Sequence, residues 1–175
     1  GNVQRPQLKG LLDRKFRDYL SEDAEYAFMA AREAFADANI DDTYLHENEV
    51  GIIWGTDGIV ENMMNNYAIM HEEKDSLMLG PTRLFRCETS SPSMNLSTIF
   101  HLRGINFSIG AACSSSSHAI GLGKMFIQQG LQDMILVGGS CEVSQESAAG
   151  TDALEALSLR NSSSQKASRP FAKGR

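Results

Sequence analysis

The stretch from Ile105 to Lys124 constrains the fold most, because it predicts a strand, a sharp turn and a helix in direct succession. The mainly apolar residues 105–109 are typical of a short strand, and small residues follow at 110–112. Cys113 and four serines come next, before a helical pattern that ends at Gly130. A strand that turns directly into a helix is the building unit of α/β folds.

Cys113 is the strongest candidate for chemistry in this stretch. At the start of a helix, unpaired N–H groups and the positive end of the helix dipole stabilise negative charge, and the thiolate is the nucleophilic form of cysteine. The small residues before it let a carbonyl group approach the backbone, so the Cys113 N–H is a candidate oxyanion donor. The plainer alternative is a buried, inert thiol.

His118 raises the question of a Cys–His pair, because it follows Cys113 by five residues. On a helix this spacing directs the two side chains well apart. We therefore interpret His118 as a hydrogen-bonded structural residue.

Further strands and helices are predicted on both sides of this stretch. Residues 50–54 and 134–137 have the apolar character of buried strands, and helices are expected at 22–38, 59–73, 91–101 and 147–157. Ser21 is expected to cap the first of these helices, and 41–47 to be a polar connection. The helix after Cys113 is apolar on nearly all sides, which favours burial between layers.

Composition narrows the possible classes of protein. The chain has 175 residues, 42% hydrophobic and 22% charged, which suits one globular domain. Its three cysteines are widely spaced, which argues against a zinc site or a disulfide framework. Free cysteines favour a reducing, cytoplasmic compartment. The net charge of −6 argues against nucleic acid as a partner. No apolar run has the length of a membrane span, and no signal peptide is expected.

Four motifs together carry a resemblance to a known family. They are S-I-G-A-A-C-S-S-S-S-H-A-I-G at 108–121, M-I-L-V-G-G-S at 134–140, D-A-L-E-A-L-S at 152–158 and S-R-P-F at 168–171. In order and spacing they resemble the elongating β-ketoacyl-acyl-carrier-protein synthases. The resemblance implies an α/β, thiolase-like fold with a mixed sheet covered by helices. Residues 1–175 would form part of its N-terminal half, without the first strand and without the C-terminal half.

The resemblance also implies a reaction. The Cys113 thiolate would take an acyl group from a thioester, and decarboxylation of a malonyl-acyl-carrier protein would supply the carbanion that attacks it. The product would be a 3-oxoacyl-acyl-carrier protein of fatty acid synthesis. No metal or redox cofactor is implied, because the substrates ride on the phosphopantetheine of acyl carrier protein. The catalytic histidines and lysine of the family belong to the other half, and none of the four histidines here matches them.

Site residues beyond Cys113 rest on the same resemblance. Gly58 or Ile59, Ser147 and Thr151 would line the acyl pocket, although ordinary loop and helix roles suit them equally well. The basic cluster of Arg14, Lys15 and Arg17, with Lys74 as a weaker member, would dock acidic acyl carrier protein, although charged clusters are usually only solvated surface. A homodimer would form by pairing of the strand Ile105–Ile109 with its copy.

Three competing hypotheses remain. In the first, the chain is a catalytically inactive fragment or a partner subunit such as a chain-length factor. In the second, it belongs to a polyketide or aryl-polyene ketosynthase of the same fold. In the third, it is an unrelated cysteine hydrolase. Chain-length factors typically lack the cysteine, and a hydrolase would need a histidine within reach of Cys113. A chain with missing strands would have open edges and uncovered apolar faces, so it should aggregate or need a partner.

Overall fold

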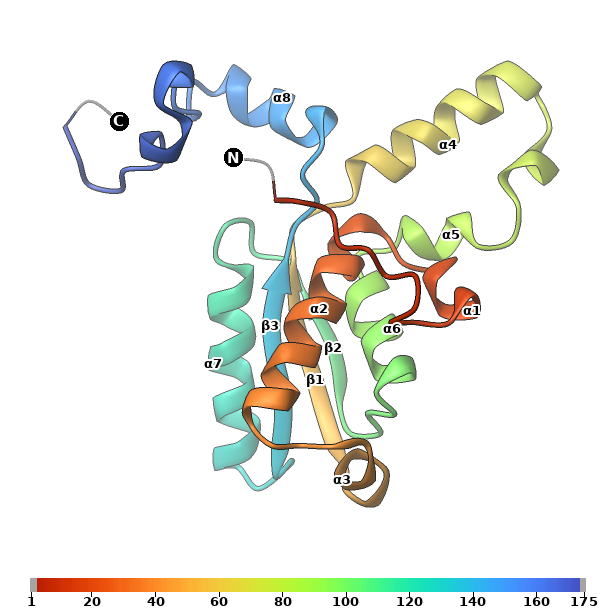
Figure 1. The fold of residues 1–175 in the computed structure, drawn as a ribbon, viewed down its shortest axis with the longest axis vertical. Coiled ribbons are helices and arrows are strands. Elements are labelled where there is room, and N and C mark those ends of the chain that lie inside the picture. The colour runs from red at the N-terminus through yellow and green to blue at the C-terminus, as the bar shows by residue number, and fades with distance from the viewer. Residues whose placement is uncertain (1–2, 174–175) are drawn as a thin grey trace.

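A parallel three-stranded sheet forms the centre of the molecule (Figure 1). The computed structural model describes residues 3–173. The strand order is β2 (Asn106–Ile109), β1 (Val50–Thr56), β3 (Met134–Ser140). Both described pairings are parallel, so the α/β class is confirmed, while the antiparallel member of a mixed sheet is not among the described strands. Helices link the successive strands, which lets all three run in one direction and end at one edge.

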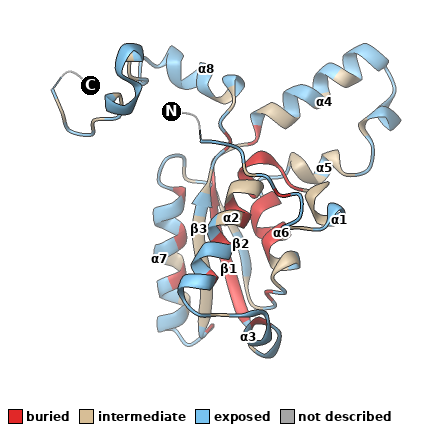
Figure 2. Ribbon diagram, viewed as in Figure 1, coloured by how far each residue is buried: buried red, intermediate tan, exposed pale blue. Residues whose placement is uncertain are grey.

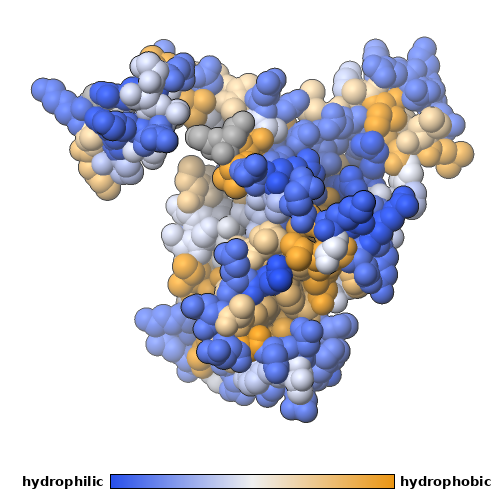
Figure 3. Space-filling view, viewed as in Figure 1, coloured by the Kyte–Doolittle hydropathy of each residue, from blue (hydrophilic) through white to orange (hydrophobic). Residues whose placement is uncertain are grey.

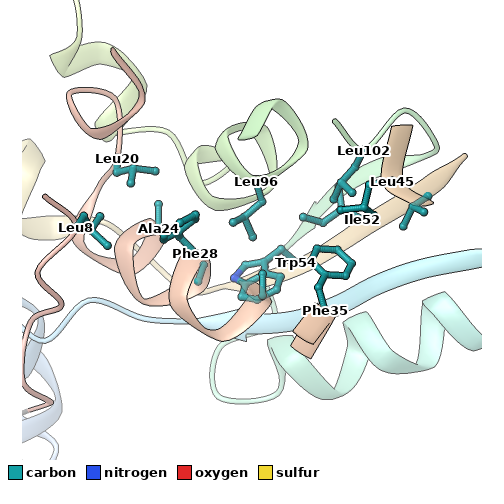
Figure 4. Packing of buried hydrophobic residues seen from close by; sticks show 13 residues of the cluster. Leu8, Leu20, Ala24, Phe28, Phe35, Leu45, Ile52, Trp54, Leu96 and Leu102 are labelled. Carbon is teal, nitrogen blue, oxygen red and sulfur yellow. The ribbon is translucent and has the colours of Figure 1, made fainter. Parts of the chain in front are cut away.

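Helices cover both faces of this sheet. Helices α2 (Glu22–Asp37) and α6 (Ser91–Ile99) pack on one face, and α7 (Ser115–Gln128) packs on the other. Ile52 and Trp54 of β1 point toward α2 and α6, where they meet Phe28 and Leu96 in the hydrophobic core (Figure 4). This buried cluster fixes the central strand from which the other two are positioned.

Helix α7 lies against the sheet through small residues. Its buried positions are Ser115, Ala119 and Gly123, and a side chain added at Gly123 would meet Val137 of β3 at 2.6 Å. The sequence favoured burial of this helix between layers, but among residues 3–173 only its sheet-facing side is covered. Ile120, for example, is 57% exposed.

The N-terminal helices depart from the sequence prediction in two details. The helix predicted at 22–38 is α2, but the Ser21 hydroxyl does not cap it: it donates to Asp23 Oδ1 at 2.5 Å and lies 2.9 Å from Ser91 Oγ. Residues 42–47, expected as a polar connection, form helix α3 (Asp42–Glu47). Asp41 caps it by accepting a hydrogen bond from the Tyr44 N–H at 2.8 Å.

Two arms extend from the edge at which the strands end (Figure 1). One consists of α4 (Val60–Glu73), η1 (Ser76–Leu79) and α5 (Arg83–Arg86), and the other of α8 (Gln145–Ala153) and η2 (Asn161–Lys166). None of these helices contains a buried residue, in contrast to the body (Figure 2). Apolar side chains such as Leu77 and Met78 lie exposed near the far end of the first arm (Figure 3). The short helix α1 (Arg14–Arg17) lies beside α5.

No helix within residues 3–173 is long and apolar enough to cross a membrane.

Candidate active site

The turn that carries Cys113 joins the end of β2 to the start of α7. Ala112 has a φ of +47°, in the left-handed region that residues with a Cβ seldom adopt. The buried Ser115 side chain holds this turn: its Oγ accepts from the Ala111 N–H at 2.8 Å and donates to the Ala112 carbonyl at 2.7 Å. The backbone before Cys113 is therefore pinned by the first residue of the helix that follows it.

Two glycines on neighbouring strands set the position of this turn against the sheet. A Cβ added at Gly55 would lie 2.5 Å from the Ser115 carbonyl carbon, and one added at Gly139 would lie 1.9 Å from Ser116 Oγ. Gly55 and Gly139 are paired across β1 and β3. No side chain fits at either position, which lets the N-terminus of α7 approach the strand ends closely. Sequence patterns alone do not indicate this role, because it depends on contacts with a helix far along the chain.

The Cys113 side chain is exposed at this turn, which excludes the alternative of a buried, inert thiol. Cys141 is also exposed and Cys87 is half-buried. Partial burial, with acidic neighbours including Asp57, raises the pKa of the Cys141 thiol, and partial burial with Glu88 raises that of Cys87. Raised pKa values disfavour the thiolate, so neither residue is a better nucleophile candidate than Cys113.

None of the four histidines completes a dyad with Cys113 in the described part of the chain. The rings of His46 and His101 pair with each other at a centroid distance of 4.4 Å, close to α3 and far from the turn (Figure 1). His71 stacks on Tyr67 within the α4 arm. His118 lies on the exposed side of α7. Its ring forms no hydrogen bond with any residue in the range 3–173, so the hydrogen-bonded structural role expected for it is not found. Within residues 3–173, the candidate nucleophile Cys113 therefore has no histidine bonded to it as a base.

The predicted acyl-pocket residues gather where the two arms leave the body. Gly58 and the buried Ile59 link β1 to α4, while Ser147 lies in the first turn of α8 and Thr151 one turn further along. Ser147 is also part of a capping box with Ser144, which gives it a structural role. Thr151 is exposed. Their acyl-binding role stays a prediction.

Glu142 connects these two segments and was not recognised as important from the sequence. It lies two residues after the end of β3, is only 4% exposed, and its Oε1 accepts hydrogen bonds from the Val60 N–H at 3.0 Å and from the Glu61 N–H at 3.1 Å. Ser144 Oγ donates to the same oxygen at 2.8 Å. The only sequence signal was an acidic residue shortly after a predicted strand.

A second buried carboxylate lies behind the turn. Asp23 is fully buried and accepts from Ser21 Oγ and, at 3.2 Å, from Thr56 Oγ1. Burial raises its pKa above the ordinary value, against the opposing effect of these hydrogen bonds. Thr56 is the last residue of β1, and its carbonyl oxygen is 3.7 Å from where a Cβ on Gly110 would lie. In the sequence, Asp23 looked like an ordinary acid of a first helical turn.

The basic candidates lie in two separate places. Arg14 and Lys15 are exposed on α1, and Arg17 beside them is half-buried with an Nε that has no hydrogen-bond partner among the described residues. Arg86 of α5 donates from its Nε to the Asp18 carbonyl at 2.9 Å, which places a further cation next to this cluster. Lys74 lies at the far end of α4, with a φ of +54°, and is not part of the cluster (Figure 1).

Comparison with known proteins identifies the class to which this fold and turn belong. The family model described as "Beta-ketoacyl synthase, N-terminal domain" matches residues 11–175. The chain therefore belongs to the β-ketoacyl synthase family.

Individual relatives agree with this assignment. The chain is 35% identical over 174 residues to 3-oxoacyl-[acyl-carrier-protein] synthase 1 of Escherichia coli, covering 98% of this chain and 43% of that protein. It is 33% identical to the protein of the same name from Buchnera aphidicola, covering 90% and 39%. A β-ketoacyl synthase crystal structure from Burkholderia phymatum matches with a TM-score of 0.84 at 27% identity, covering 99% and 42%. The chain thus spans less than half the length of the relatives that it matches.

Structural neighbours at lower identity show the fold alone. A ketosynthase of Xenorhabdus doucetiae, solved in complex with its chain length factor, matches with a TM-score of 0.70 at 21% identity, covering 88% of this chain and 38% of that one.

Proposed function

We propose that the protein carrying this chain catalyses a decarboxylative Claisen condensation between an acyl thioester and malonyl-acyl-carrier protein in fatty acid synthesis. The observation that carries the proposal is the exposed Cys113 on a turn that is pinned by Ser115 and seated against Gly55 and Gly139. The names of the relatives at 33–35% identity support the same reaction.

In the proposed first step, the Cys113 thiolate attacks the thioester carbonyl of an acyl group carried by acyl carrier protein. A carbon–sulfur bond forms to Cys113, the bond to the phosphopantetheine sulfur breaks, and the carrier thiol takes up a proton. Backbone N–H groups at the start of α7, that of Cys113 among them, are proposed to hold the oxyanion of the tetrahedral intermediate.

In the second step, malonyl-acyl-carrier protein loses CO₂, and the resulting carbanion attacks the acyl-enzyme carbonyl. A carbon–carbon bond forms, the Cys113 sulfur leaves as the thiolate, and a 3-oxoacyl product two carbons longer remains on the carrier. Loss of CO₂ drives the step, so its electron balance needs no redox cofactor. None of the four histidines of this chain is assigned to decarboxylation. His46 and His101 pair with each other, His71 stacks on Tyr67 in the α4 arm, and His118 is exposed on the first turn of α7.

Acyl carrier protein, which is acidic, is the proposed partner of the basic cluster on α1. Arg14, Lys15 and Arg17 are close together, and Arg86 extends the positive surface, whereas the distant Lys74 would contribute only to a larger footprint. A homodimer through residues 105–109 is supported by the position of β2 at the edge of the sheet, where Phe107 is 45% exposed. We place the protein in the cytoplasm, because its proposed nucleophile must stay reduced.

The competing hypotheses receive less support. A chain-length factor does not account for the retained, exposed Cys113. A polyketide ketosynthase rests on neighbours that share the fold at low identity. A cysteine hydrolase would need a histidine partner for Cys113, and within residues 3–173 no histidine side chain is hydrogen-bonded to it.

The reaction is tested by assaying 3-oxoacyl product from an acyl-acyl-carrier protein and malonyl-acyl-carrier protein, with the intact protein and two variants. Cys113→Ser should abolish product, because the alcohol is a much weaker nucleophile, while Cys141→Ser should retain it. Full activity of the Cys113→Ser protein would contradict the proposal.

The docking of acyl carrier protein is tested by its binding affinity at low and high ionic strength. Raising the ionic strength should weaken carrier binding to the unmodified protein, because salt screens the attraction. The affinity of the variant in which Arg14 and Lys15 are both changed to Glu should depend less on ionic strength.

A further inference from the structure

The side chain of Glu142 joins three parts of the molecule that meet beside the turn of Cys113. The residue lies two positions after the end of β3, and its carboxylate accepts from two backbone N–H groups at the start of α4. Ser144, in the connection to α8, donates to the same carboxylate. With 4% of its surface exposed, this carboxylate has little access to water and depends on these three donors.

Besides Glu142, α4 is held by the side chain of Asn66, which donates to Cys87 Sγ at 3.1 Å and accepts from Arg83 at 3.3 Å. Helix α8 packs against α4. Neither α4 nor α8 buries a residue, so hydrophobic burial does not orient them. At the start of α4, the carboxylate satisfies two of the N–H groups that a helix leaves unpaired, and its negative charge faces the positive end of the helix dipole. Glu142 is thus a charged, buried anchor for an arm that is otherwise exposed.

The same anchor reaches the start of α8 through serine hydroxyls. Ser144 Oγ donates to Glu142, and it accepts from the Ser147 N–H at 3.1 Å, which forms the capping box of α8. Residues 59 and 147, both predicted to face the acyl chain, adjoin this network: Ile59 precedes Val60 along the chain, and the Ser147 N–H donates to Ser144 Oγ.

We propose that Glu142 is a positioning residue that fixes the start of α4 relative to the start of α8, and that through Ile59 and Ser147 it sets which acyl chain lengths Cys113 accepts. The inference rests on the proposed acyl transfer to Cys113. Glu142 acts through its neighbours and touches neither substrate nor thiol.

The test uses Glu142→Gln in the intact protein, because glutamine keeps the shape and one acceptor but removes the charge. Glu146→Gln is the matched control: it is an exposed glutamate in the first turn of α8 that lies outside the hydrogen-bond network. Ser144→Ala is a second variant, which removes one donor and leaves the carboxylate in place, should Glu142→Gln fail to fold.

Three measurements separate the inference from the proposed function. Hydrogen exchange of the Val60 and Glu61 amides should speed up by about tenfold in Glu142→Gln, the effect of one lost charge-assisted hydrogen bond, and less in Ser144→Ala. The ratio of Cys113 acylation rates for a butyryl and a dodecanoyl thioester should change by about tenfold, while alkylation of Cys113 by iodoacetamide stays within about twofold. Glu146→Gln should leave all three unchanged.

Unchanged amide exchange would overturn the role of Glu142 as an anchor. Faster amide exchange with an unchanged ratio of the two acylation rates, which includes equal slowing of both, would overturn its role in chain-length selection. Absence of acylation in the unmodified protein would instead contradict the proposed function, and the exchange data would still decide whether Glu142 holds the start of α4.

Discussion

Strand β1 buries all seven of its residues, whereas α4, which follows it along the chain, buries none. The two elements are separated by only a few residues, yet they belong to regions held together by different forces. The body is stabilised by apolar contacts within the chain, with Ile52 and Trp54 at its centre. The arm begins at the hydrogen bonds to Glu142 and continues with exposed apolar side chains such as Met63. Cys113 belongs to the body, while the predicted acyl-binding residues lie where the arms begin.

The largest expected contrast comes from removing the same side chain in each region. Leu96 is completely buried in the body, and Leu77 is 83% exposed on the arm. Leu96→Ala should lower the free energy of unfolding by about 2–5 kcal/mol, because it leaves a cavity. Leu77→Ala should change it by less than about 0.5 kcal/mol. Equilibrium urea unfolding of both variants measures the difference, and similar values would remove the distinction between body and arm.

A smaller contrast in stability is expected between Gly55, which faces helix α7 from strand β1, and Gly121, which lies within α7. Gly55→Ala should cost about 1–3 kcal/mol, because the new methyl group collides with the backbone at Ser115. Gly121→Ala should stabilise by about 0.5–1 kcal/mol, since nothing lies within 4 Å of its Cβ position and alanine favours the helix. Thermal unfolding gives both signs. Slower alkylation of Cys113 in Gly55→Ala, but not in Gly121→Ala, would show that the contact between Gly55 and Ser115 also positions the turn that carries Cys113. A Gly55→Ala protein as stable as the parent would contradict the close approach.

The smallest effect concerns the pH dependence of the body. Burial raises the pKa of Asp23, so the folded state holds this proton more tightly than the unfolded chain. The resulting stabilisation is complete below the ordinary pKa of 3.8 and is lost as the pH rises through the raised value in the folded state. Asp23→Asn should remove this fall in stability between acidic and neutral pH. Unfolding free energies at several pH values measure it, and parallel pH profiles for the two proteins would show that Asp23 does not contribute.

The sequence predicted the individual strands and helices, α4 of the arm included, better than the contacts between them, for physical reasons. Burial on both sides makes β1 a continuous apolar run, and the strand at 105–109 followed by a turn at Cys113 was clear from residue type alone. The carbonyl and amide partners of Ser115 and the contacts of Gly139 depend on distances between segments far apart in the chain, which local patterns do not encode. For the same reason Glu142 appeared as one acid among several.

Errors in the prediction also follow from long-range packing. The apolar character of α7 indicated burial on all sides, but residues 3–173 cover only the side that faces the sheet. Ser21 has the residue type of a helix cap, yet its hydroxyl bonds to the neighbouring Asp23 and to Ser91, which the tertiary fold brings close. Tertiary hydrogen bonds here override a local preference that is correct for many helices.

The most direct test of the central claim is the site of acyl transfer. The intact protein is incubated with an acyl-acyl-carrier protein in the absence of malonyl thioester, and the modified peptide is identified by mass spectrometry. The account predicts one acyl group on Cys113, sensitive to hydroxylamine as a thioester should be, with Cys87 and Cys141 unmodified. Acylation of Cys141 instead, or no acyl-enzyme at all, would contradict the assignment of Cys113 as the nucleophile.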